Sequence, residues 1–284
     1  MPDAAARQLT DALLAPLTLD PSVLVEAEGI PETLAAHAMP CPGAGPFRLT
    51  DHAVRTALTP RQDAGTDTPF AWSARTARRA LGVAAVRSLA TGQVRSPTEG
   101  VRSRVAQATR SGEGHHPTSA MDRWLASLPA AALNAVVAEA VTWATRLWSA
   151  LDWSAFETAP TIGRDHWWNS PHSSLLAIRS RAEVRSAVRD SAGQPASVHL
   201  VVLGGARRAT VRAELSVVAL VEALRRSDPL PPGRVVGWWP DSGHLVRVEI
   251  DRSTLDTGVV AVARALTSLA GARTPLQAET AAAA

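Results

Sequence analysis

The stretch SVHLVVLGG, residues 197–205, decides the fold class of this chain. It predicts a buried strand, because a short apolar run bounded by turn residues is typical of a strand covered on both faces. Gly204 and Gly205 end the run, and a helical pattern, TVRAELSVVALVEALRR, follows from residue 210. A buried strand, a turn and a helix in this order predict an α/β protein. Whether the two glycines bind a phosphate or simply turn the chain is left open at this point.

The patterns on either side of this stretch extend the same prediction. Upstream, SSLLAIRSRAEVRSAV (173–188) indicates two short strands or one bent strand. Downstream, GRVVGWWP (233–240) and HLVRVEI (244–250) indicate strands, and STLDTGVVAVARALTSLAG (253–271) indicates a final helix. We therefore expect a mixed β-sheet flanked by helices.

The first half of the chain is predicted to be helical or irregular. Prolines interrupt residues 1–68, which leave room for short helices such as Asp51 to Leu58. The segment WSARTARRALGVAAVRSLATG (72–92) predicts a helix with Ser73 as its N-cap and Gly92 as its stop. Residues 119–153 are strongly helical in pattern. We expect an irregular arm (1–68), an arginine-rich helical region (69–128), an α/β core (129–272) and a disordered tail (273–284).

Composition excludes several chemistries. All 29 basic residues are arginine, so the chain has no lysine, and it has no tyrosine either. A lysine base, a lysine Schiff base and a P-loop lysine are therefore excluded, and arginine stays protonated in proteins. The single cysteine, Cys41, excludes an intramolecular disulfide. With no basic-apolar leader and no apolar run of membrane-spanning length, we expect a cytoplasmic protein without a membrane partner.

The order of elements resembles the core of the PD-(D/E)XK nuclease superfamily, in particular its RecB-like branch with a restriction-endonuclease-like core. SRAEVR resembles the strand that carries the first metal-binding acid, here Glu183. HLVVL resembles the next strand, which in the family ends in an acid, one residue and a lysine. RAELSVVALVEAL and RVVGWWPDSG resemble the following helix and strand, and the likeness covers about residues 130–270.

The departures from this family argue against catalysis. Active members hold Mg²⁺ with two carboxylates, and the metal activates the attacking water. Here Leu203, Gly204 and Gly205 occupy the position of the acid and the lysine. The resemblance therefore implies a nuclease-like fold that has lost its catalytic pair, and the glycines mark the gap. The alternative is a Mg²⁺-dependent nuclease with an atypical carboxylate site, whose candidate residues for catalysis and metal binding are Glu139, Glu183 and Glu214.

Other residue types suggest binding partners. Clustered arginines supply the counterion release that dominates nucleic-acid affinity, and an exposed tryptophan beside arginine can stack on a base. The candidate nucleic-acid contacts are Arg75, Arg78, Arg79, Arg87, Arg207, Arg208, Arg212, Trp168 and Trp239. Histidines, including the His115-His116 pair, do not reach the ligand count of a zinc site. We predict a non-catalytic protein that binds DNA or RNA or scaffolds a complex in DNA metabolism or its regulation, without a cofactor. A pure protein-interaction module is the remaining alternative.

Overall fold

The computed structural model describes residues 4–20, 22–23, 27–38, 47–59, 71–110, 119–174, 176–225 and 230–282. Cys41 and the His115-His116 pair lie outside these residues. The chain forms two compact units. The helical unit comprises residues 1–10 and 68–163, and the α/β unit comprises residues 11–67 and 164–284. Helix α1 (Ala4–Leu14) begins in the first and ends in the second.

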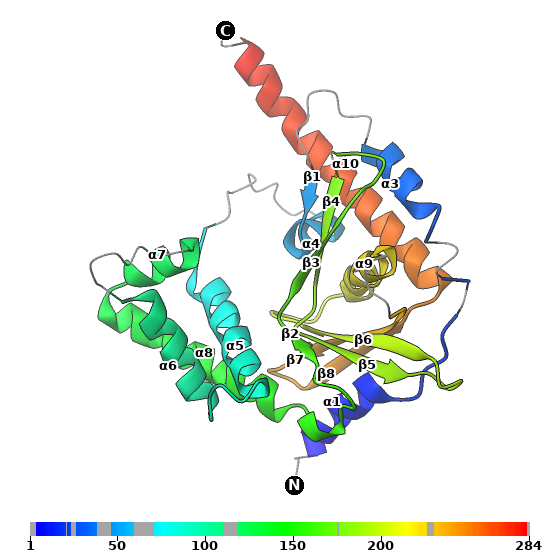
Figure 1. Ribbon diagram of the computed structural model, residues 1–284. Coiled ribbons are helices and arrows are strands. Elements are labelled where there is room, and N and C mark those ends of the chain that lie inside the picture. Colours follow the sequence, from blue (N-terminus) through cyan, green and yellow to red (C-terminus); the bar gives the residue numbers. More distant parts are fainter. Residues whose placement is uncertain are drawn as a thin grey trace. The chain divides into compact units, whose positions relative to one another are not determined.

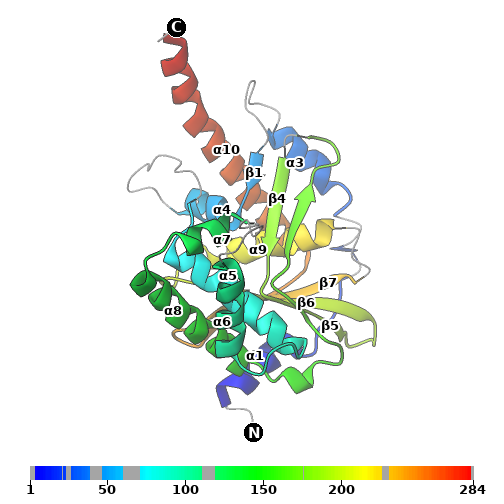
Figure 2. The same ribbon diagram turned by 60° about the vertical axis from the view of Figure 1, so that its left-hand side comes forward.

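The helical unit consists of helices that pack along one another (Figure 2). Its further elements are α5 (Ala74–Ala90), α6 (Pro97–Ala108), α7 (Ala120–Ala126), α8 (Ala130–Ser149), the 3₁₀ turn η1 (Trp153–Ala155) and β2 (Thr161–Ile162). Ser73 caps α5 through a capping box with Thr76, and Gly92 follows the helix with a φ of 69°, so the predicted start and stop are confirmed. The predicted helical segment 119–153 is interrupted at Pro129, which separates α7 from α8.

Small residues bring the helices of this unit close together. A Cβ atom on Gly82 would collide with the Trp143 indole, and one on Gly100 would lie 2.9 Å from the Cβ of Ala85. Helix α5 therefore packs tightly against both α8 and α6. Arg87 links α5 to the end of the unit, because its guanidinium donates to the carbonyl oxygens of Ile162 at 2.9 Å and Gly163 at 2.7 Å.

The α/β unit confirms the predicted class, with helices flanking mixed sheets (Figure 1). Its elements are α3 (Ile30–Ala38), β1 (Phe47–Leu49), α4 (Asp51–Leu58), β3 (Asp165–Asn169), β4 (Leu176–Arg181), β5 (Val184–Arg189), β6 (Pro195–Val202), α9 (Val211–Leu224), β7 (Pro232–Trp239), β8 (His244–Glu249) and α10 (Arg252–Ala282). The predicted strand at 197–202, the helix at 51–58 and the helix after Gly205 are confirmed.

The strands of this unit belong to two sheets. One has the order β1-β4-β3, with β1 parallel and β3 antiparallel to β4. In the second sheet, the strands that belong to the α/β unit follow the order β5-β6-β7-β8. Strands β6 and β7 run parallel and are joined through α9, while β5 and β8 are antiparallel to their neighbours. The 173–188 segment thus forms two strands, β4 and β5, which pair in different sheets.

Helix α9 lies at the centre of the α/β unit. It contacts strands β4 and β7 and packs along α10 (Figure 1). Every residue from Leu215 to Leu224 is buried, and a helix that is apolar all round is expected in such a position. Glu222 is the one charged residue in this buried run, and its exposed fraction is only 3%.

The units follow different boundaries from the ranges expected in the sequence. Helix α8 packs against α5 and α6 of the helical unit, whereas the sequence ranges placed it with the α/β core. Segment 11–67 joins the α/β unit, because β1 pairs with β4 and α4 packs against α10. Helix α10 continues to Ala282, through most of the segment expected to be disordered. In the part of the chain that the structure describes, no helix combines the length and apolar character needed to cross a membrane.

Candidate functional site

The sheet β1-β4-β3 has two chemically different faces. Alternate residues of a strand point to opposite sides, and the pairing register places matching residues side by side. The inner face carries Phe47, Leu49, His166, Trp168, Leu176, Ile178 and Ser180. The outer face carries Arg48, Asp165, Trp167, Asn169, Ala177, Arg179 and Arg181. We call this second set the outer sheet face.

Trp167 is the main aromatic feature of the outer sheet face. Its exposed fraction is 40%, which is high for a tryptophan. Arg179 lies opposite it on β4, with the guanidinium carbon 5.8 Å from the ring centroid. This is a cation–π arrangement, and Asp51 and Asp165 also hold the guanidinium by ion pairs. The indole is thus supported on one side and open to solvent.

A second row of the outer sheet face is open and cationic. Arg48 and Asn169 are exposed and flank the small Ala177, about 10 Å apart across two strand spacings. Among the described residues, Arg48 has no ion pair or hydrogen-bond partner for its side chain. The face therefore combines a stacking surface with uncommitted positive charge.

The rest of this face is held in place by charge pairing. Arg181 lies 3.7 Å from Asp51 and 3.8 Å from Glu183. Burial lowers the pKa of the Arg181 guanidinium, and the carboxylates of Asp51 and Asp165 oppose that effect. Because Asp51 begins α4, directly after β1, it ties that helix to the strand beneath Trp167.

The inner face carries a buried ionic cluster around Glu222. The Oε1 atom accepts hydrogen bonds from Arg185 at 2.9 Å and from Ser180, and the Oε2 atom accepts one from Arg225 at 2.9 Å. His166 Nδ1 lies 3.2 Å from the same Oε2 atom. These contacts satisfy the carboxylate from four side chains, as a buried charge requires.

The cluster controls the protonation of Glu222. Burial alone would raise the pKa of this carboxyl group. The hydrogen bond with His166, the attraction of His199 and Arg185 and the hydrogen bond from Ser180 outweigh burial and hold the pKa well below its ordinary value. Glu222 is therefore ionised at neutral pH, and it serves to fasten α9 to β3, β4 and β5.

The three predicted carboxylates have separate partners. Glu139, in the helical unit, pairs with Arg78 at 3.4 Å and is half exposed. Glu183 is buried just before β5, where its Oε2 atom accepts from the backbone N–H of Val202 at 2.6 Å. Glu214 is held by Arg208 through two bonds of 2.6 and 2.5 Å and by Thr210 at 2.9 Å. Within the described residues, no three acidic, histidine or cysteine side chains are arranged to hold a metal ion.

The region of Gly204 and Gly205 is a turn between β6 and α9. Gly205 has a φ of 77°, a conformation that favours glycine, and Arg208 donates to the carbonyl oxygen of Gly204 at 3.3 Å. Glu183 lies beside the end of β6, where its carboxylate accepts a hydrogen bond from the backbone N–H of Val202. The glycines thus lie in the loop that precedes α9, and the first acid of that helix, Glu214, is already paired with Arg208.

The predicted nucleic-acid contacts have different environments. Both predicted tryptophans are buried, Trp168 with 6% exposed and Trp239 with 4%, so the expectation that these rings face outward is corrected. In the first pair the exposed ring is Trp167, and in the second pair Trp238 is also buried, since β7 is buried along its whole length. Arg78, Arg87 and Arg208 are committed to partners. Arg75, Arg207 and Arg212 are exposed, and Arg79 is partly exposed.

Sequence reasoning missed Trp167, Arg179 and Arg48. The signal for Arg179 was present, because Leu176 and Ile178 alternate with Arg179 and Arg181 along β4. The position of Trp167 on the same face could be deduced from that alternation only if the strand register that pairs Trp167 with Arg179 were known. Compared with known proteins, the sequence matches no protein-family model and no curated protein.

Proposed function

We propose that this protein binds single-stranded nucleic acid on the outer sheet face and does not cut it. The observation that carries the proposal is the exposed indole of Trp167, backed by Arg179, on an open sheet with the free guanidinium of Arg48 nearby. Single strands are bound by aromatic rings that stack on bases and by cations that follow the phosphates. The proposed complex stacks one base on Trp167 and brings a neighbouring phosphate to Arg48.

A single strand fits this face better than a duplex. In a duplex the bases are already stacked and their faces are unavailable to a protein ring. A flat strand surface with one projecting indole offers stacking but no element that enters a major groove. Asn169, exposed in the same row as Arg48, offers a donor and an acceptor for the edge of a base.

The placement of the carboxylates supports binding rather than cleavage. A two-acid metal site needs carboxylate oxygens free to coordinate Mg²⁺. Glu214 forms a two-bond ion pair with Arg208, and Glu183 is bonded to a backbone N–H group. The succession β5, β6, α9 and β7 also supports the proposal of a nuclease-like core without its catalytic pair.

The test measures binding of the full chain to a fluorescently labelled 12-nucleotide single strand and to the matching duplex, by anisotropy over a series of salt concentrations. We expect the single strand to bind more tightly than the duplex. Trp167→Ala should weaken single-strand binding about 5- to 150-fold, since base stacking contributes about 1–3 kcal/mol. Trp167→Phe should retain most of the affinity. Val260→Ala, which changes an exposed apolar residue on α10, is the control and should have no effect.

Two outcomes would overturn the proposal. The first is absence of single-strand binding at low salt, or binding that Trp167→Ala leaves unchanged. The second is Mg²⁺-dependent shortening of the labelled strand that is abolished in Glu183→Gln or Glu214→Gln while binding persists. That second result would establish the nuclease alternative instead.

A further inference from the structure

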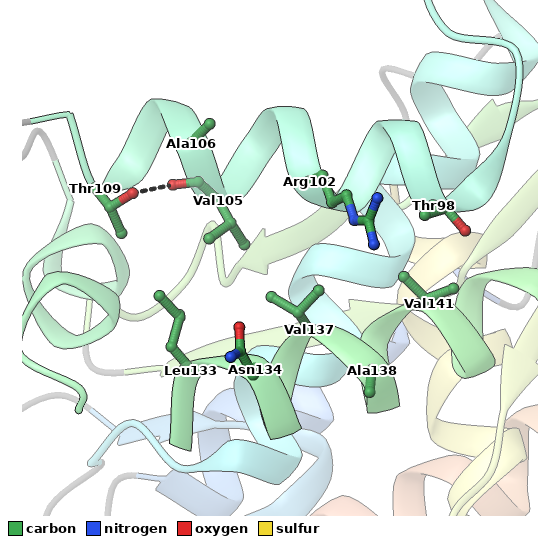
Figure 3. Close-up of a pocket in the computed structure, with 10 residues that line it drawn as sticks. All are labelled: Thr98, Arg102, Val105, Ala106, Thr109, Leu133, Asn134, Val137, Ala138 and Val141. Carbon is green, nitrogen blue, oxygen red and sulfur yellow. Dashed lines mark hydrogen bonds between the residues drawn. The ribbon is translucent and has the colours of Figure 1, made fainter. Parts of the chain in front are cut away.

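A groove in the helical unit offers a second interaction surface, independent of the outer sheet face. It runs between α6 and α8 and has a volume of about 680 Å³ (Figure 3). Its α6 side includes Val105 and Arg102, and its α8 side includes Leu133, Val137 and Val141. Figure 3 shows the side chains of the two helices lining the space between them.

The α8 wall of the groove is an apolar ridge. Leu133, Val137 and Val141 are spaced four residues apart, so they form one line along the helix of about 12 Å. All three are only partly buried, although side chains of this kind are usually covered in a folded protein. The ridge is the complement of a helix that carries apolar residues at positions i, i+4 and i+7.

Among the residues that the structure describes, Arg102 is the only charged one that lines the groove, and it is exposed. Its side chain has no ion pair or hydrogen-bond partner in the part of the chain that the structure describes. In Figure 3 it extends from α6 toward the space above Val137 and Val141. An apolar ridge with one unpaired cation at its edge favours an occupant that is apolar on one face and acidic beside it.

The groove lies along two helices of a packed three-helix arrangement. Helix α5 contacts both α6 and α8, and the close approaches at Gly82 and Gly100 fix that three-helix arrangement. Four-helix arrangements are a recurrent way for helices to cover their apolar faces. We infer that the groove binds an amphipathic helix of a partner protein, with its apolar face on the Val137 ridge and an Asp or Glu side chain paired with Arg102.

The test uses synthetic 16-residue helical peptides and the full-length chain. The acidic peptide carries leucine at i, i+4 and i+7 with glutamate on one flank of that face. A second peptide has lysine in place of those glutamates, and a third has the acidic composition in scrambled order. Fluorescence anisotropy should show that the acidic peptide binds about fivefold or more tightly than the lysine peptide, and that the scrambled peptide does not bind.

Two substitutions locate the site. Val137→Arg should abolish binding of the acidic peptide by placing a charge on the ridge. Arg102→Glu should reverse the preference, so that the lysine peptide binds more tightly than the acidic one. Arg123→Glu, an exposed charge reversal on α7, is the matched control and should keep the original preference.

The inference fails if none of the peptides binds, or if Arg102→Glu leaves the preference unchanged while circular dichroism shows a folded chain. It also fails if the unsubstituted chain is a dimer in sedimentation and Val137→Arg makes it a monomer, since the groove would then accept a second copy. Because these readouts involve no nucleic acid, they are independent of the proposed function.

Discussion

The two faces of the sheet β1-β4-β3 use the same residue types for opposite purposes. Beneath the inner face, Arg185 of β5 and Arg225 at the end of α9 surround Glu222, and each guanidinium is fixed by this buried carboxylate. On the outer face, Arg48 has no partner among the described residues, and Arg179 lies over an exposed indole. Arginine content alone therefore does not identify a binding surface. Exposure and the absence of a nearby carboxylate distinguish an arginine that can bind a ligand from one that supports the fold.

Removing the inner carboxylate should have the largest effect. In Glu222→Gln, the charge of Arg185 stays buried without its counterion, which costs about 3–5 kcal/mol of unfolding free energy. Urea denaturation followed by circular dichroism measures it. The matched control is Glu139→Gln, whose half-exposed pair with Arg78 contributes at most about 1 kcal/mol. Equal losses in the two variants would show that the cluster is no more important than a surface ion pair.

The adjacent tryptophans of β3 offer the sharpest contrast between the faces. Trp168→Ala empties a core position and should cost about 3–5 kcal/mol. Trp167→Ala removes an exposed ring and its cation–π contact with Arg179, and should cost about 1 kcal/mol or less. The same denaturation experiment measures both. A large loss in Trp167→Ala would mean that this ring supports the fold and that the outer sheet face is less open than its exposure indicates.

The pH dependence of stability should also distinguish the inner cluster. Since the pKa of Glu222 is lowered in the folded protein, its contribution is present above the unfolded pKa of about 4.3 and is lost as the pH falls toward the folded value. The stability difference between the unsubstituted chain and Glu222→Gln should therefore be constant above about pH 5 and shrink by up to about 1.4 kcal/mol per unit below about pH 4. A difference that is independent of pH from 7 to 3 would contradict an ionised Glu222.

The smallest expected effect concerns the free cation of the outer face. Arg48→Ala should reduce the salt dependence of single-strand binding by about 0.7 in the slope of log K against log salt, the value of one phosphate contact. Arg225→Ala is unsuitable as a control for binding, because the Arg225 guanidinium is paired with Glu222 and its loss affects stability. The informative control is Arg252→Ala, an exposed position on α10, which should leave the slope unchanged. An unchanged slope in Arg48→Ala would place the phosphate contacts elsewhere.

The sequence predicts the local elements of this fold better than its long-range contacts. Periodicity and cap chemistry predict the strand at 197–202, the capping residues of α5 and helix α9. The division of 173–188 between two sheets does not, because strand partners lie far away in the chain. The short β3 strand shows no alternation of its own, so the sequence could not tell which tryptophan of the pair faces solvent.

The candidate site was only partly accessible to sequence reasoning. Composition suggested an exposed tryptophan among arginines. Which tryptophan and which arginine lie together depends on the register between β3 and β4. The ionic cluster was not predictable at all, since Glu222 lies in an otherwise apolar helix and its partners come from three strands and the end of that helix. Its only signal in the sequence is an acid on a helix without a polar face.

The buried Arg234 of β7 bears on how the chain completes its fold during synthesis. Its guanidinium donates to the carbonyl oxygens of Leu13 at 3.2 Å, Ala15 at 2.7 Å and Pro16 at 3.1 Å, which are groups that the end of α1 leaves unpaired. The bond to Ala15 closes a sequence separation of 219 residues. During synthesis, the end of α1 therefore waits for a strand far along the chain before its carbonyl groups are capped. Residues 13–16 are thus made well before the arginine that secures their carbonyl groups.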